Sequence, residues 1–390
     1  MRAALEMGVK AEDWQAAGAR ACNLSELVLT LGEVAAAVGD AEASVSYADR
    51  SGDAFVRMAF RTTHADALHK AGRRAEAETR FREAQQMQAE SQPDYPLLYS
   101  LSGFLYCDLL LAEAERAAWQ RHLECASPLV LWQERSDAAG TTVERESDAS
   151  PATAPPPPQS ARGLAHSKAL RAVSERAAQT LKWVIQHQTG LLAIALDHLT
   201  LGRAALYAAI LESPSPSPLN LDGEAMAGGQ TATGEGRPAP IHTARFHLPS
   251  SALEHLESAV SGLRRSGRSD VLPQGLLTRA WLRSLTGALT SAQDGPDSAQ
   301  SDLDKAWEIA ERGPMPLFMA DIHLSRARLF GVRSAERGVR NEDAPYPWDK
   351  HPDGSPRGPK DDLAEARRLI FKHGYLRREA ELKDAEAALL

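Results

Sequence analysis

Residues 65–84 read ADALHKAGRRAEAETRFREA and carry the clearest helical pattern of the chain. It alternates small and large apolar residues at helical spacing on either side of a glycine. The positions are Ala65, Leu68, Gly72, Ala77, Phe81 and Ala84. Small side chains allow two antiparallel helices to cross closely, and the large ones fill the space beside the crossing. The stretch therefore predicts a helical hairpin of roughly 34 residues.

The same pattern recurs along the chain, which predicts a stack of hairpins. A small residue near the middle of each first helix serves as the marker of a repeat. The markers are Gly32, Ala65, Gly103, Gly202, Ala280 and Ala327. The first intervals are close to one repeat, and the later ones become so when inserted segments are allowed for.

Three long segments rich in proline or glycine interrupt the pattern, at 131–166, 213–248 and 332–360. Such composition leaves no apolar face to bury, so the segments are predicted to be disordered insertions in turns. The predicted organisation is N-terminal hairpins in residues 1–130 and C-terminal hairpins in residues 167–390. The last helix is predicted to cap the stack.

The composition supports an all-α fold and limits the function. Hydrophobic residues make up 43% of the chain and aromatic residues 6%, and strand signals are nearly absent. The net charge of -8 argues against nonspecific nucleic-acid binding, which needs a concentrated basic surface. The most apolar run, GLLAIALDHLTLG, is interrupted by Asp197 and His198, and the N-terminal residues lack the apolar region of a secretory signal. We expect a cytoplasmic protein that binds neither a membrane nor nucleic acid.

No catalytic or cofactor motif stands out. The chain has no phosphate-binding loop, dinucleotide fingerprint, HExxH or GxSxG. The histidines are interpreted as structural or surface residues, and no metal site or cofactor is predicted. Paired basic residues such as Arg377 and Arg378 are interleaved with acids and are interpreted as a solvated helix face.

Several segments resemble the tetratricopeptide repeat (TPR) region that follows NACHT or STAND-type NTPase modules in bacterial signalling proteins. The resemblance is carried by residues 61–88, 96–119, 194–207, 275–293, 302–330 and 361–389, including RTTHADALHKAGRRAEAETRFREAQQMQ and DDLAEARRLIFKHGYLRREAELKDAEAAL. It implies a TPR-like α-solenoid that recognises a partner without catalysis. The chain departs from the family pattern because it carries no NTPase or effector part.

We therefore expect a scaffold that binds a protein or peptide, such as an NTPase or effector domain, on the concave face of the solenoid. The candidate contact residues are Asp66, His69, Lys70, Phe104, Arg203, Tyr207, Trp281 and Arg328. Arg203, Arg328 and Asp66 are favoured because charged side chains are difficult to bury. For the apolar candidates, packing between repeats is the alternative interpretation.

Two other functional classes stay open. One is a sensor region that recognises a small ligand or nucleic acid and acts with a signal-transducing NTPase. The other is an enzyme whose site is assembled from dispersed helical residues, which no motif supports.

Overall fold

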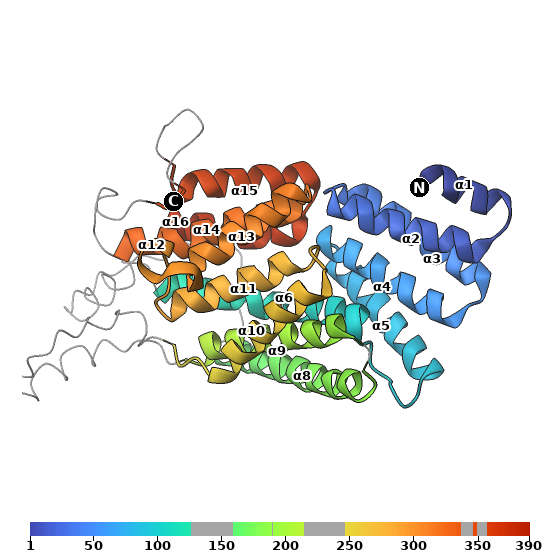
Figure 1. The fold of residues 1–390 in the computed structure, drawn as a ribbon, viewed down its shortest axis with the longest axis horizontal. Helices are drawn as coiled ribbons and strands as arrows, with labels where there is room; N and C mark the ends of the chain where they lie inside the picture. The colour runs from blue at the N-terminus through green and yellow to red at the C-terminus, as the bar shows by residue number, and fades with distance from the viewer. Residues whose placement is uncertain (126–158, 189, 214–245, 337–345, 349–356) are drawn as a thin grey trace, which may run out of the picture.

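A computed structural model describes residues 1–125, 159–188, 190–213, 246–336, 346–348 and 357–390. In these ranges the regular secondary structure consists of fifteen α-helices and two short 3-10 helices, and no strand is present (Figure 1). The predicted all-α class is confirmed. Most of residues 131–166, 213–248 and 332–360 lie outside the described ranges, so their predicted disorder stays a prediction.

The helices pack mainly as consecutive pairs. The pairs are α2 (Trp14–Thr30) with α3 (Val34–Ser51), α4 (Ala54–Lys70) with α5 (Arg74–Ser91), α11 (Leu272–Leu285) with α13 (Ala299–Arg312), and α14 (Pro316–Glu336) with α15 (Pro359–His373). In the middle of the chain, α9 (Leu191–Glu212) packs against three helices, namely α6 (Ser100–Cys125), α8 (Gln159–Gln186) and α10 (Ser250–Ser266). The remaining elements are α1 (Arg2–Lys10), α12 (Ser291–Asp294), η3 (Gly295–Asp297), η4 (Leu376–Arg378) and α16 (Glu379–Leu389). Helix α6 also packs against α9, and side chains of both helices belong to the largest apolar cluster.

The marker at Gly32 is wrong, since this residue lies in the turn between α2 and α3. Its φ is +82°, and Gly72 occupies the equivalent turn after α4 with φ +78°. These two hairpins therefore align with an offset of 40 residues, which places Ser25 at the position of Ala65. Ser25 is fully buried, and its Oγ donates a hydrogen bond of 2.8 Å to the carbonyl oxygen of Ala37. Glycine is common both at close helix crossings and in left-handed turns, and the sequence pattern does not distinguish the two.

The other markers lie in helices and not in left-handed turns. Gly202 lies at a helix crossing, because a Cβ there would come within 2.7 Å of the Leu256 side chain on α10. Ala280 and Ala327 are fully buried. Gly103 lies in the first turn of α6, where a Cβ would collide with the nearby backbone carbonyl of Leu98.

The predicted insertions extend too far at their ends. Helix α8 already begins at Gln159, and α14 continues to Glu336, because both stretches consist mostly of residues compatible with a helix. Tyr346 and Trp348 pack against the core, with the Trp348 ring 5.0 Å from that of Phe330. Counting prolines and glycines overlooked these aromatic side chains, which bury a large apolar area.

Helix α9 is, in the described part of the chain, the one helix long and apolar enough to cross a membrane. Of its most apolar window, 61% is buried inside the protein. Leu196, Leu199, Leu206 and Ile210 are fully buried in the largest apolar cluster. The helix therefore has the packing of a central core helix.

The C-terminal elements return to the first two hairpins (Figure 1). A ring nitrogen of His373, at the end of α15, lies 3.1 Å from the carbonyl oxygen of Gly32. A Cβ at Gly72 would lie 2.9 Å from the Leu376 side chain in η4. These contacts enclose a space between the N-terminal hairpins and the C-terminal helices.

Replacing Ala65 by leucine should lower the stability of the protein. Ala65, Ala77 and Phe81 have no exposed surface and belong to one apolar cluster, so the added atoms overpack the crossing. We expect a cost of about 1–3 kcal/mol, measured by chemical denaturation. Ala75→Leu is the control, because Ala75 is exposed on α5 of the same hairpin. Equal effects of the two substitutions would contradict the register assigned to this hairpin.

Replacing Gly32 by alanine tests the contact between the first hairpin and the C-terminal helices. The new Cβ would collide with Pro316 and lie 2.5 Å from a ring nitrogen of His373. Gly52 has a similar φ of +72° and open space around it, so Gly52→Ala reports the backbone strain alone. We expect Gly32→Ala to lower the melting temperature more than Gly52→Ala does. The additional loss in the free energy of unfolding should be about 1–3 kcal/mol. Equal melting temperatures of the two variants would show that the contact contributes nothing to stability.

Candidate functional site

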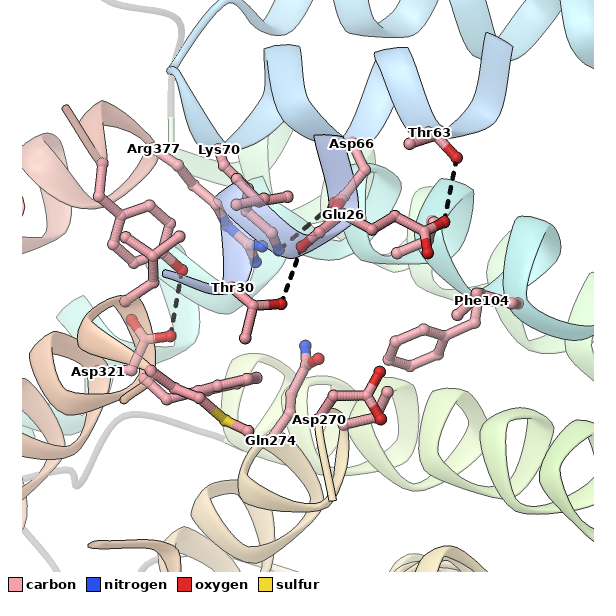
Figure 2. Close-up of a pocket in the computed structure, with 18 of the residues that line it drawn as sticks. Glu26, Thr30, Thr63, Asp66, Lys70, Phe104, Asp270, Gln274, Asp321 and Arg377 are labelled. Atoms are coloured by element: carbon pink, nitrogen blue, oxygen red, sulfur yellow. Dashed lines mark hydrogen bonds and ion pairs between the residues drawn. The ribbon is translucent and has the colours of Figure 1, made fainter. Parts of the chain in front are cut away.

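A cavity of about 160 Å³ lies in the space enclosed by the C-terminal elements (Figure 2). Its wall is formed by residues of α2, α4, α6, α11, α14 and η4, together with the turn before α11. The apolar part consists of side chains such as Phe104, Leu105 and Phe318. We call it the outer cavity.

Asp66 is the most unusual polar group of the outer cavity. It is 9% exposed, and its buried Oδ1 has no hydrogen-bond partner in the described residues. The nearest cation is Lys70 Nζ at 3.6 Å, which is also 3.2 Å from Asp108 Oδ2. Burial raises the pKa of Asp66, and the attraction of Lys70 only partly opposes this effect. Asp66 therefore lacks a cationic donor of its own.

Glu26 of α2 lines the outer cavity together with Asp66 of α4 (Figure 2). Thr63 Oγ1 donates a long hydrogen bond of 3.4 Å to Glu26 Oε1, and no basic side chain in the described ranges lies within 4.0 Å. The side chain reaches solvent, yet the surrounding protein removes enough water to raise its pKa. The nearby Asp270 differs, since Arg268 holds it in a two-bond ion pair of 2.6 and 2.8 Å.

A buried ion-pair network adjoins the outer cavity and is centred on Asp108 of α6. Asp108 accepts two hydrogen bonds from Arg377 and one of 2.9 Å from Gln274, and it lies 2.8 Å from Arg203 Nη1. Burial opposes ionisation of this carboxyl. Arg377, Lys70 and Arg203 outweigh burial and hold its pKa well below the usual range.

The network continues about two turns further along the same face of α6, at Glu115. Its two oxygens accept hydrogen bonds from Arg203 at 3.0 Å and from Arg378 at 2.9 Å. Burial opposes ionisation, but these arginines lower the pKa of Glu115 to about 2. Arg378 also binds Asp321 at 2.8 Å and Glu381 at 2.5 Å. The network thus joins α6, α9, α14, η4 and α16 by charge.

A second, smaller cavity of about 40 Å³ adjoins the first, and we call it the inner cavity. The two cavities share Gln274, Asp321 and Arg378 in their walls. Trp281 closes the inner cavity and stacks on Trp119, with ring centroids 3.6 Å apart.

Seven of the eight residues singled out in the sequence line these two cavities. Asp66, Lys70 and Phe104 line the outer cavity, and Arg203, Tyr207, Trp281 and Arg328 line the inner one. His69 lines neither cavity. It is 3% exposed, with Nε2 at 3.8 Å from Asp108 Oδ2.

The expectation that Arg203 and Arg328 stay exposed is wrong. They are 1% and 2% exposed, because acidic side chains of other helices meet them inside the core. Arg203 pairs with Glu115, and Arg328 binds Glu381 Oε2 at 3.2 Å. Burial of an arginine is tolerated when its charge and donors are matched in this way.

The interpretation of Arg377 and Arg378 as a solvated face is also wrong, since both side chains are buried in the network. A signal for this was present in the sequence. Asp108 and Glu115 are seven residues apart, which places both on one face of a largely apolar helix. Two buried carboxylates need basic partners, although their spacing does not say which arginines supply them. Glu26 and Gln274 carried no sequence signal.

Within the described ranges, no group of three or more histidine, cysteine or acidic residues is arranged to hold a metal ion. A comparison with protein-family models found no match, and a comparison with curated proteins found no similar sequence.

Removing the Arg203 side chain should strongly destabilise the protein, contrary to the role of an exposed binding residue. Arg203→Ala leaves Asp108 and Glu115 with one cation fewer in a buried site. We expect a loss of about 3–5 kcal/mol in denaturant titrations. Arg82→Ala, which breaks an exposed pair with Glu78, should cost less than about 1 kcal/mol. Equal stability of the two variants would refute the structural role of the network.

Proposed function

We propose that this protein is a non-catalytic recognition module, a TPR-like solenoid that binds a protein or peptide partner in the cytoplasm. The partner inserts a cationic side chain into the outer cavity. The observation that carries the proposal is the incompletely paired Asp66, which is nine-tenths buried. Beside it lies Glu26, which has no basic side chain within 4.0 Å in the described residues. A lysine or arginine of the partner would supply the missing donor, and both carboxyls would then be favoured in their charged form.

The apolar wall and the size of the cavity define the rest of the ligand. Phe104 and Leu105 offer contact to the methylene groups that carry a cationic head. A volume of about 160 Å³ is close to that of a cavity known to hold benzene, roughly 150 Å³. It therefore suits one long side chain of the partner.

A sensor region that acts with a signal-transducing NTPase is the second candidate. It is favoured by the position of the cavity between the first hairpins and η4, where Arg377 and Lys70 both bind Asp108. A small cation bound there would contact elements from both ends of the chain. Its binding could thereby be coupled to a change in their relative position.

The proposal is tested with the full chain and an array of synthetic peptides of varied sequence. We expect the bound peptides to be enriched in lysine or arginine next to apolar residues. Asp66→Asn and Glu26→Gln keep the shape of each side chain and remove its charge. Each should weaken binding of a selected peptide about tenfold, measured by calorimetry, because a charge-assisted hydrogen bond is lost.

Glu311→Gln is the matched control, since Glu311 is an exposed acid on α13 outside both cavities. It should leave the affinity unchanged. Selection of acidic or uncharged peptides, or an equal effect of all three variants, would reject the outer cavity as the binding site.

A further inference from the structure

We propose that the inner cavity is a second subsite, which binds an oxygen acceptor of the same ligand whose cationic group lies at Asp66 and Glu26. This inference rests on the proposed function and adds the chemistry of the second half of the ligand. The acceptor is a carboxylate or carbonyl oxygen. The ligand thus carries a cation and an oxygen acceptor on one short framework.

The first argument is a buried donor without an acceptor. Trp281 is 2% exposed, and its Nε1–H has no hydrogen-bond partner in the described residues. Its ring is held by the stack on Trp119 and by Tyr207, whose ring centroid is 5.7 Å away. An unpaired buried donor is costly, so an acceptor oxygen from a ligand would satisfy it.

The second argument comes from Arg328, which lines the same cavity. Its Nη1 and Nη2 donate to Glu381, while the buried Nε–H has no partner in the described part of the chain. The guanidinium also lies 4.7 Å from the centroid of the Trp119 ring, which fixes its plane beside the tryptophan stack. Two residues of one cavity thus each retain an unused N–H donor.

The third argument is that two hydroxyl groups in the same wall already donate their protons to backbone carbonyl oxygens. Thr278 Oγ1 donates to the carbonyl oxygen of Gln274 at 3.0 Å, and Ser325 Oγ donates to that of Asp321 at 2.8 Å. The unused hydrogen-bonding capacity of Trp281 and Arg328 is therefore that of donors. A volume of about 40 Å³ accommodates one small acceptor group.

The two cavities are neighbours, and the proposal places one ligand across both. Gln274, Asp321 and Arg378 belong to both walls. The outer cavity lacks a donor at Asp66, and the inner cavity lacks an acceptor at Trp281. This polarity matches a molecule with its cation in the outer cavity and its oxygen in the inner one.

Four probes separate the two halves of the ligand and the source of the acceptor. Hexylamine carries the cation alone, and hexanoate carries the carboxylate alone. The compound 6-aminohexanoate carries both, and N-acetyl-lysine methylamide presents a lysine with backbone carbonyls as a peptide does. Binding is followed by the indole N–H signal of Trp281 in proton–nitrogen spectra of the full chain, assigned with Trp281→Phe.

We expect 6-aminohexanoate, the lysine amide or both to bind more tightly than hexylamine and to shift the Trp281 signal downfield. If only 6-aminohexanoate shifts the Trp281 signal, the acceptor is a carboxylate. If only the lysine amide shifts it, the acceptor is a peptide carbonyl. Trp281→Phe keeps an aromatic ring and removes the N–H. It should therefore weaken the binding of the responding probe about tenfold and leave the affinity for hexylamine unchanged. Trp183→Phe, which changes a tryptophan outside both cavities, should affect neither probe.

The outcomes separate this inference from the proposed function. Hexylamine binding that requires Asp66, with no Trp281 response to any probe, overturns the inner subsite alone. A Trp281 response to hexanoate, without hexylamine binding, supports the inner subsite and contradicts the cationic site. Failure of all four probes to bind overturns both.

Discussion

The buried charge of Asp108 constrains how the C-terminal elements pack against the middle of the chain. This carboxylate and Glu115 lie inside α6, and arginines from α9 and η4 neutralise them. Removing charges from water is costly, and the cost is offset only when several partners converge with good geometry. The C-terminal elements must therefore lie against α6, since they supply Arg377 and Arg378.

That requirement also explains why the cavities lie where they do. The ion pairs occupy positions that stacked helices otherwise fill with interdigitating apolar side chains. Lys70 Nζ lies closer to Asp108 than to Asp66, so Asp66 shares this cation with Asp108. The same network that closes the fold thus leaves one carboxyl of the outer cavity incompletely paired.

Local sequence patterns predicted the helical hairpins well and their register less well. Ala65, Ala77 and Phe81 are buried as their spacing indicated. Gly32 was misassigned because a glycine can be required by a close crossing or by a positive φ, and the two needs look alike in sequence. The prediction of the candidate site was limited in a similar way. Most chosen residues line the cavities, but the argument that Arg203 is too polar to bury was wrong.

The class of fold and the inward-facing positions of the first helices could be predicted from the sequence alone. Both depend on apolar periodicity within short segments, which acts over one or two helical turns. Only the tertiary structure decided which charges neutralise one another and which donors stay unused. Arg378 and Glu115 are 263 residues apart, and no local spacing relates them. The binding chemistry proposed for Asp66 and Trp281 arises from what those long-range pairings leave unsatisfied.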